Sequence, residues 1–373
     1  MASHVPLLAV RPDEQSAFDT DMVKTRDFGA TNGLMSPPST MDDDFAEGPE
    51  APMLPRVPPA TRLPAAVRFP LVVLLSLSLS TLFYSLTADW IGVELAAISR
   101  TVEDEWQVGT VVAWKLAELS VAWYAGYDYK DLASLSCLSN LPYYFLLHTF
   151  YELHGLTCAT ALAIDMASIA LPFALLRPLI HAHEPGRSPN QQVAHDPTIS
   201  ALMAVLGAAI YAVVVYGSLF TWLPAHLVFH FDHIRSVQHA HDATLHLLLG
   251  ILIVPVGVAT THFLFTPAIG ARGNPGITDP KLKPEAVRFD PEEASFAQTM
   301  AFNLGYGPDG FTKRGEVLAK RAAVLVACSA GNTLVRVLTT IDGTEPVGAV
   351  AWAGVWGLAA TLTALAYGWA GNE

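Results

Sequence analysis

The stretch GLTCATALAIDMASIALPF, residues 155–173, contains one carboxyl side chain, Asp165, in an otherwise uncharged and largely apolar run. A helix that crosses the hydrocarbon core of a bilayer needs roughly 20 such residues. Because lipid offers no hydrogen bonds to the backbone, an apolar run of this length predicts a transmembrane helix. An ionisable group in a bilayer costs several kcal/mol, so Asp165 is expected to face the interior of a helix bundle.

Seven further stretches resemble this one, and together they predict the fold class. The chain has 373 residues, of which 52% are hydrophobic and 15% are charged, whereas roughly 25% are charged in an average soluble domain. The mean hydropathy is +0.37. We therefore predict an all-α, polytopic transmembrane bundle of about eight spans, at 69–87, 106–125, 132–153, 156–180, 199–222, 243–265, 316–338 and 347–370.

The segments outside these spans predict the topology. Residues 1–64 are acidic and proline-rich, which is typical of a disordered tail, and the remainder, 65–373, forms the bundle with one long loop at 266–315. With eight spans, nearly all lysines and arginines fall on the side of the tail, and Arg100, Arg235 and Arg336 fall on the other. This bias places both termini and the long loop in the cytoplasm, as expected for a multi-pass protein of the endoplasmic reticulum. The net charge of −13 argues against binding to nucleic acid.

The second span places Lys115 and Glu118 three residues apart near its middle, beside Trp114. This spacing puts both side chains on one helix face, where they can pair. The pair is either a structural lock between helices or a carboxyl group whose proton affinity is tuned for catalysis. Trp114 is a candidate for cation stabilisation, since aromatic faces attract positive charge.

Asp165 has no basic residue within one turn of its own span. Unless another helix supplies a cation, burial is expected to keep this side chain protonated. A neutral carboxylic acid in a bundle can donate a proton to a substrate, or it can form a simple hydrogen bond between helices.

Two other spans carry polar stripes. Tyr144 and His148 share a face of the third span, and Asn332 and Arg336 share a face of the seventh. All four are candidates for substrate binding, although a lone histidine is more often hydrogen-bonded packing. Arg336 is near the end of its span, so it could also extend to the membrane surface.

The connector HLVFHFDHIRSVQHAHDATLH, residues 226–246, is rich in histidine. His226, His230 and His233 could share one helical face and bind a metal. The separated histidine boxes of membrane oxygenases are absent, however, so the sequence favours no metal. Asp232 and Arg235 are expected to pair and to order the mouth of the bundle.

Catalytic motifs for other chemistries are also absent. The sequence has no GxSxG motif, no phosphate-binding glycine loop and no paired Asp-rich motifs of the kind that bind diphosphate through magnesium. Proton-initiated chemistry on a lipophilic substrate remains compatible with the buried carboxyls.

Five ordered landmarks carry a family resemblance: HFDHIRSVQHAH at 230–241, FLFTP at 263–267, RFDPEEASFAQT at 288–299, KRGEVLAKRAAVL at 313–325 and IDGTEPVGAVAWAGVWGL at 341–358. With the span count, they resemble the fungal membrane-bound terpene cyclases of ascofuranone, ascochlorin and macrophorin type, which act in meroterpenoid secondary metabolism. The resemblance covers roughly residues 69–370.

The resemblance implies a cyclase without a cofactor. Such enzymes protonate an epoxide or terminal olefin of a farnesyl chain on an aromatic or polyketide-derived head group, and the cation then cyclises. Glu118 and Asp165 are the expected acid and its partner, and Asp232 is a third candidate if the site opens to the lumen. The expected substrate-binding residues are Trp114, Tyr144, His148, Arg235, Asn332 and Arg336. A proton-coupled transporter of a lipophilic metabolite and a histidine-ligated metal oxidase are the alternatives.

Overall fold

A computed structural model describes residues 64–100, 105–184, 191–242, 244–271, 294–307 and 310–370. All of them belong to the compact unit Arg56–Glu373. Apart from Pro64, the predicted tail at 1–64 lies outside the described residues.

The predicted helical class is confirmed for the described residues, and each predicted apolar segment coincides with a helix. The long helices are α1 (Ala65–Leu86), α3 (Glu105–Tyr124), α4 (Tyr129–Tyr151), α5 (Gly155–Leu176), α7 (Pro197–Phe220), α13 (Lys313–Thr340) and α14 (Pro346–Ala370). One further long helix is built from α10 (Leu245–Leu252), the π-helical turns η3 (Ile253–Val258) and η4 (Thr261–Phe265), and α11 (Thr266–Gly270). The short elements are η2 (Ala88–Gly92), α2 (Val93–Ala96), α6 (Gln191–Ala194), α8 (Leu223–His230), α9 (Gln238–Asp242), α12 (Phe296–Asn303), β1 (Tyr306–Gly307) and β2 (Gly310–Phe311).

Six of the described helices are long and apolar enough to cross a bilayer, so the chain is a helical membrane protein. They are α1, α5, α7, the continuous helix 245–270, α13 and α14. The predicted spans at α3 and α4 do not reach this criterion. α3 carries Lys115 and Glu118, whereas α4 is rich in serine and also holds Asp131 and Asn140.

Helix α4 tolerates this polar composition because it is enclosed by other helices. Nearly every one of its side chains from Asp131 to Tyr151 is buried. Its N-terminus is capped by Asp128, whose carboxylate accepts a hydrogen bond from the Asp131 amide at 2.9 Å. α4 is therefore the central helix, and its polar side chains meet protein partners instead of lipid.

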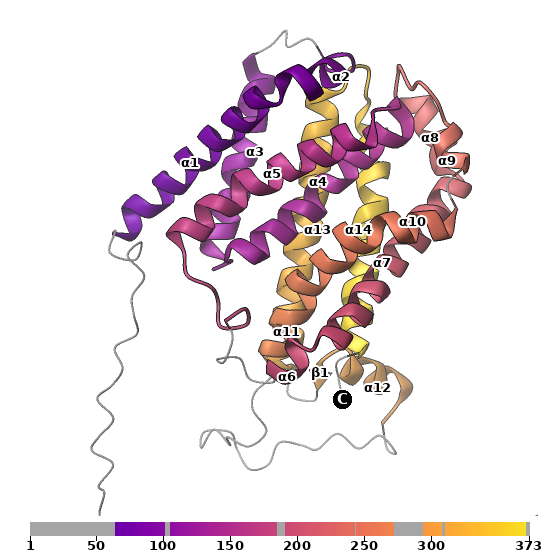
Figure 1. Cartoon of the computed structure of the whole chain (residues 1–373). Helices are drawn as coiled ribbons and strands as arrows, with labels where there is room; N and C mark the ends of the chain where they lie inside the picture. Colours follow the sequence, from indigo (N-terminus) through magenta and orange to yellow (C-terminus); the bar gives the residue numbers. More distant parts are fainter. Residues whose placement is uncertain are drawn as a thin grey trace, which may run out of the picture. The chain divides into compact units, whose positions relative to one another are not determined.

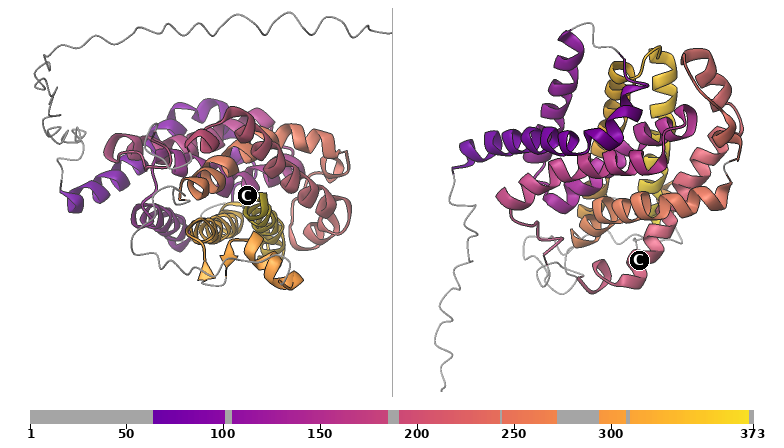
Figure 2. Two further views of the ribbon diagram at one scale, coloured as in Figure 1. Left: turned by 90° about the horizontal axis from the view of Figure 1, so that it is seen from below. Right: turned by 45° about the horizontal axis from the view of Figure 1, so that its top comes forward.

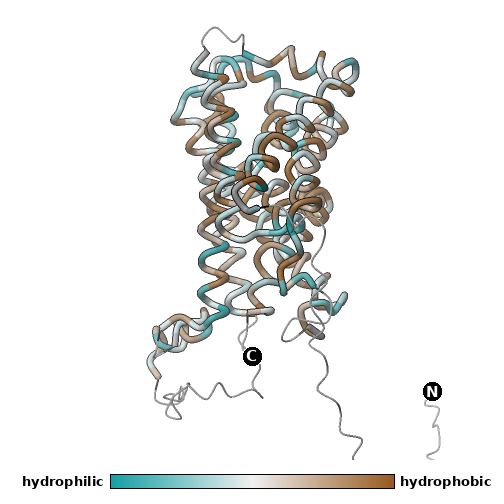
Figure 3. The backbone as a smooth tube through the Cα atoms, turned by 90° about the vertical axis from the view of Figure 1, so that its left-hand side faces the viewer, coloured by the Kyte–Doolittle hydropathy of each residue, from teal (hydrophilic) through white to brown (hydrophobic). Residues whose placement is uncertain are grey.

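The long helices pack around α4. α1, α5 and α4 lie side by side with a common slope, and the pair α13–α14 crosses them (Figures 1 and 2). α7 packs against η3 and α14. Hydrophobic residues fill the middle of the helices, and hydrophilic residues gather toward their ends (Figure 3).

The predicted cytoplasmic loop at 266–315 is shorter than expected at both ends. The helix preceding it continues to Gly270, and α13 already begins at Lys313. Within the loop, a capping box between Ser295 and Gln298 starts α12, and the β1–β2 hairpin follows. Residues 272–293 of this loop lie outside the described residues.

The histidine-rich connector is mostly helical and packs against the turn before α14. The Asp232 amide donates to the Gly343 carbonyl at 2.8 Å, and the Glu345 amide donates to the His230 carbonyl at 3.0 Å. Gly343 has φ of 66°, and a Cβ there would approach the Asp232 side chain to 2.5 Å. Two of the landmark segments, at 230–241 and 341–358, therefore meet at one end of the bundle.

Candidate functional site

Asp165 of α5 lies at the centre of a buried polar network that joins α5 to three other helices. Its Oδ2 accepts hydrogen bonds from the Tyr144 hydroxyl of α4 and from Arg336 Nη1 of α13, both at 2.7 Å. Its Oδ1 accepts one from the Tyr84 hydroxyl of α1 at 3.1 Å. The sequence predicted a neutral Asp165 unless another helix supplied a cation, and α13 supplies that cation through Arg336. A carboxylate with three donors beside a guanidinium is the charged form.

Arg336 points into the bundle, so of the two positions that the sequence left open, the one at the membrane surface is excluded. Its Nη1 donates to Asn140 Oδ1 at 2.7 Å, in addition to its contact with Asp165. The guanidinium carbon lies 4.8 Å from the ring centroid of Tyr143 and 5.2 Å from that of Tyr144. A guanidinium over two aromatic faces is stabilised by cation–π attraction, and its direction is fixed by polar partners.

A chain of hydrogen bonds leads from Arg336 toward the predicted Lys115–Glu118 pair. Asn332 Nδ2 donates to Asn140 Oδ1 and to the Ser139 carbonyl, both at 2.9 Å. The Ser139 hydroxyl donates to Glu118 Oε1 at 3.5 Å. The structure therefore gathers two predicted carboxyls and the polar stripe of α13 into one network.

The Lys115–Glu118 ion pair forms as predicted, with Nζ and Oε2 3.6 Å apart. Glu118 is buried, whereas the Lys115 side chain is 20% exposed. Trp114 packs over Gly331 of α13, where an added Cβ would approach its ring to 2.1 Å. The α3 face thus contacts α13 through Trp114 and α4 through the Glu118–Ser139 hydrogen bond.

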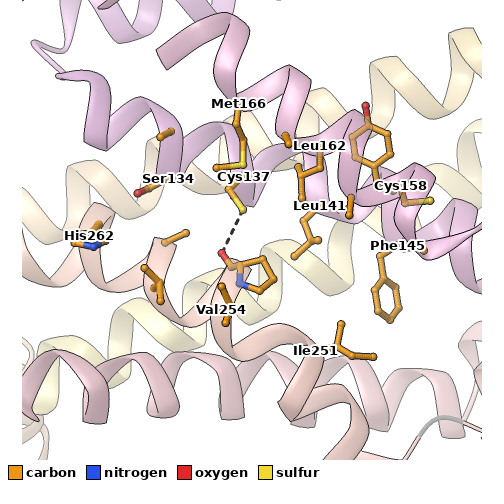
Figure 4. A pocket seen from close by; sticks show the side chains of 18 of the residues that line it. Ser134, Cys137, Leu141, Phe145, Cys158, Leu162, Met166, Ile251, Val254 and His262 are labelled. Atoms are coloured by element: carbon orange, nitrogen blue, oxygen red, sulfur yellow. Dashed lines mark hydrogen bonds between the residues drawn. The ribbon is translucent and has the colours of Figure 1, made fainter. Parts of the chain in front are cut away.

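A large apolar cavity borders this network. It has a volume of about 1040 Å³ and lies between α4, α5 and the helix 245–270 (Figure 4). Its wall is built mainly of alanine, leucine, valine and sulfur-containing side chains, with Tyr129, Tyr144 and Phe145 as aromatic members. Exposed residues on both rims, Ala159 and Ala163 of α5 and Val254 of η3, indicate that it opens sideways toward the bilayer. This size suits a lipophilic molecule.

Tyr144 joins the cavity to the polar network. Its side chain lines the cavity, while its hydroxyl contacts Asp165, Arg336 and, at 3.0 Å, the Tyr84 hydroxyl. Sequence reasoning named Tyr144 only as a substrate-binding residue and missed Tyr84, Ser139 and Asn140. The serine and asparagine in α4 were a detectable signal, since polar side chains in a membrane helix face protein partners.

Three predicted site residues lie away from this network. His148 lines the cavity, but its Nδ1 is 2.9 Å from the Leu153 carbonyl and its ring stacks on His239. Asp232 and Arg235 lie on the connector, and no ion pair joins them among the described residues. Arg235 instead lines a separate pocket of about 270 Å³. The predicted Asp232–Arg235 pair is therefore wrong, because the Gly343 turn holds Asp232.

The predicted metal-binding spacing of the connector does not produce a site. α8 ends at His230, and His233 follows with a left-handed φ of 60°. The three histidines therefore do not share one helical face. His230 Nδ1 is instead paired with Glu345 at 2.7 Å.

Another group of potential metal ligands, Asp128, Asp131 and His183, lies at the opposite end of α4. Its ligand atoms already have protein partners. Arg321 Nη1 and Nη2 donate to the two oxygens of Asp131 at 2.6 and 2.9 Å. His183 Nδ1 is 2.8 Å from Asp128 Oδ2, and its Nε2 is 3.3 Å from the His262 carbonyl. Both ring nitrogens are therefore engaged by protein groups.

The electrostatics of this group agree with a structural role. Burial raises the pKa of Asp128, but its hydrogen bond to His183, the charge of that ring and the amide donors outweigh burial and lower the pKa below the ordinary value of 3.8. We call Asp128, Asp131, His183 and Arg321 the ionic lock, because it joins the start of α4 to α13 and to residues 180–183.

Comparison with known proteins gives one partial match. A family model described as the C-terminal domain of bouquet formation protein 3 matches residues 196–339. This region runs from the start of α7 nearly to the end of α13, and it includes Asn332 and Arg336 but excludes Glu118, Tyr144 and Asp165. It covers less than half of the chain. No curated protein and no solved structure gives a significant match.

Proposed function

We propose that this protein is an integral membrane cyclase that starts ring closure of a farnesyl-type meroterpenoid by protonating an epoxide or a terminal olefin. The observation that supports this proposal best is the position of Tyr144. Its ring lines an apolar cavity, and its hydroxyl contacts both an arginine and a carboxylate. A group that transfers a proton to a lipophilic substrate needs contact with the apolar space and with a polar reservoir.

The first step transfers the Tyr144 hydroxyl proton to the epoxide oxygen as a C–O bond breaks. The negative charge left on Tyr144 is stabilised by Arg336, whose Nη1 lies 3.3 Å from that oxygen, and by the Tyr84 hydroxyl. An alkene of the same substrate attacks the carbocation, and loss of a proton from the cyclised cation restores the tyrosine. The product is an isomer of the substrate, so no cofactor is consumed.

In this proposal Asp165 does not contact the substrate and acts through Tyr144. As a carboxylate it orients the Tyr144 hydroxyl and balances the charge of Arg336. Glu118 is the more distant carboxyl of the network, joined through Ser139. The proton donor in this proposal is therefore the Tyr144 hydroxyl, and not Glu118 or Asp165 as the sequence led us to expect.

The proposal includes eight membrane spans, with both termini on the cytoplasmic side of the endoplasmic reticulum membrane. α3 and α4 have 20 and 23 residues, or lengths of about 30 and 35 Å at 1.5 Å per residue, which suffice to cross a hydrocarbon core. A glycosylation reporter in the α3–α4 connection should remain unmodified if that connection is cytoplasmic. Modification there would refute this topology.

The enzymatic proposal is tested with membranes from a host that lacks related activity. An epoxyfarnesyl-phenol is supplied without nucleotide and in the presence of a chelator, and products are analysed by mass spectrometry and NMR. We expect a cyclised product of unchanged mass from membranes that contain the protein. Ala159→Trp, at the rim of the cavity, should abolish the product without preventing accumulation of the protein. Unchanged cyclisation by that variant would place the reaction elsewhere.

The match to the family model described as the C-terminal domain of bouquet formation protein 3 favours a second candidate, a role in bouquet formation. For this role we propose a membrane scaffold without enzymatic activity. This role would use the matched region 196–339 and would not need the cavity. Ala159→Trp separates the candidates, because a scaffold should remain functional in cells when the cavity is blocked. A cyclase should lose its product under the same change.

A further inference from the structure

The cavity is elongated and follows the whole length of α4. Residues of α4 that line it recur from Tyr129 to His148, and from Lys130 to Tyr144 the helix rises about 21 Å at 1.5 Å per residue. α5 lines the cavity from Gly155 to Met166, and the helix 245–270 lines it from Ile251 to His262. This form suits an extended single chain better than a compact molecule.

Polar side chains line the two ends of the cavity, and apolar ones line the middle. Tyr129, Lys130, Ser134 and His262 belong to one end, whereas Tyr144 and His148 belong to the other. In Figure 4, Ser134 and His262 lie at one side, and Phe145, Cys158 and Ile251 lie at the other. The cavity therefore accommodates an amphiphile with its head group near Lys130 and its chain extending toward Tyr144.

The end near Lys130 carries a basic side chain in its lining. Of the described residues that line the cavity, none is acidic. The carboxyls that flank Lys130 in sequence, Asp128 and Asp131, are occupied by His183 and Arg321 in the ionic lock. No hydrogen bond or ion pair engages the Lys130 ammonium among the described residues. A half-buried ammonium beside an apolar space is stabilised by an anionic partner.

We infer that the cavity binds a single-chain lipophile whose head group is a carboxylate, and that this carboxylate pairs with Lys130 while the chain reaches Tyr144. The inference extends the proposed function, since it takes the cavity as the substrate site and names the head group. Without a ligand, Lys130 would be only a basic residue at a cytoplasmic helix end. That simpler role predicts no preference among ligands of different head-group charge.

The test measures equilibrium binding to the full chain in nanodiscs of uncharged phosphatidylcholine. A fluorescent long-chain carboxylic acid is the probe, and its methyl ester, the matching amine and phosphatidylglycerol are competitors. A charge-assisted hydrogen bond predicts that the acid binds roughly 10-fold more tightly than the ester, or better. Lys130→Gln should remove this difference and leave ester binding unchanged, and Lys130→Arg should preserve it.

Two controls accompany these variants. Lys320→Gln, on the exposed surface of α13, should bind like the parent protein, and Ala159→Trp should lose both the acid and the ester. Equal affinity for acid and ester, a preference that survives in Lys130→Gln, or displacement of the probe by phosphatidylglycerol alone would overturn the inference.

The binding assay requires no turnover, so its outcome is separate from that of the cyclase proposal. Binding that depends on Lys130 without any cyclisation would reject the cyclase and support the acidic ligand. Cyclisation that is identical for acid and ester substrates, with no effect of Lys130→Gln, would reject the acidic ligand and support the cyclase.

Discussion

Among the described residues, two buried aspartate–arginine pairs attach other helices to α13, and their surroundings differ. Arg321 pairs with Asp131 of α4, and Arg336 pairs with Asp165 of α5. In the ionic lock, Asp131 accepts two hydrogen bonds from Arg321, and Arg321 also donates to the Phe263 carbonyl. In the network near the cavity, Asp165 shares Arg336 with Asn140 and Tyr144. The first pair is closed by main-chain groups and a neighbouring histidine, whereas the second is completed by side-chain hydroxyls, one of which belongs to the cavity wall.

This difference suggests that buried charge alone does not identify a functional site. Both pairs would be found by a search for buried carboxylates. Only the second includes a side chain, Tyr144, that also lines the apolar cavity. We therefore assign stability to the first pair and chemistry to the second, and the predictions below test that division.

The largest effect on stability is expected from Arg321→Gln in the ionic lock. Loss of one partner leaves the buried Asp131 carboxylate without its cation, which typically costs about 3–5 kcal/mol. The measurement is the thermal unfolding midpoint in detergent, with the amount of folded protein as a second readout. The double variant Asp131→Leu with Arg321→Met should be more stable than Arg321→Gln, because no lone charge remains. A single variant as stable as the parent would contradict the assignment.

Asp165→Asn should lower turnover strongly. Its effect on stability should be smaller than that of Arg321→Gln, because Arg336 keeps its hydrogen bond to Asn140 and its contacts with two tyrosine rings. The amide keeps hydrogen-bonding capacity toward Tyr84 but loses the charge that balances Arg336, and a disturbed general-acid system typically costs roughly 10²-fold or more in rate. Initial rates of cyclisation in membranes provide the measurement. Glu118→Gln should have a smaller effect, since it reaches the network only through Ser139. Unchanged turnover in both variants would remove the carboxyls from the mechanism.

The pH dependence of stability should report the ionic lock through Asp128. Its pKa is lowered in the folded protein, so its stabilising contribution is fully present above the ordinary pKa of 3.8 and is lost as pH falls through the lower folded pKa. Unfolding midpoints measured between pH 6 and the acid limit of the detergent system should therefore fall less in Asp128→Asn than in the parent. Parallel acid profiles would show that Asp128 makes no such contribution.

The smallest effect is expected from Lys115→Gln. Its ammonium is 3.6 Å from Glu118 and 20% exposed, and Glu118 keeps its hydrogen bond from Ser139. The loss should therefore be smaller than the about 3–5 kcal/mol typical of a broken, fully buried pair. The unfolding midpoint should change slightly, with turnover close to that of the parent. A loss of turnover as large as that of Asp165→Asn would extend the functional network to α3.

The fold could be predicted from the sequence at the level of elements, because apolar length is a local property. The helices around Asp165 and Arg336 begin and end within a few residues of the predicted spans. α4 is less apolar than a lipid-facing span, because its enclosure by other helices permits serine and asparagine side chains that lipid would not. Enclosure is a tertiary property that residue-by-residue hydropathy does not contain.

The candidate site could be predicted in its members but not in its connections. Glu118, Asp165, Asn332 and Arg336 were each singled out, but the sequence could not tell whether another helix supplies a cation to Asp165 or whether Arg336 points inward or to the surface. The 2.7 Å contact between Asp165 and Arg336 joins two residues that are 171 positions apart in sequence. No local sequence pattern encodes such a contact. The Asp232–Arg235 prediction failed for the same reason, because a distant turn at Gly343 holds Asp232.

The central claim is that the Tyr144 hydroxyl acts at the boundary between the cavity and the Asp165–Arg336 pair. The most direct test compares Tyr144→Phe with Tyr143→Phe, since the neighbouring tyrosine also lies against Arg336 but bonds to Thr340. Rates of epoxyfarnesyl-phenol cyclisation are measured in membranes that contain equal amounts of each variant. We predict a loss of roughly 10²-fold or more for Tyr144→Phe and a change of only a few-fold for Tyr143→Phe. Equal rates for the two variants, or full activity in Tyr144→Phe, would contradict the claim.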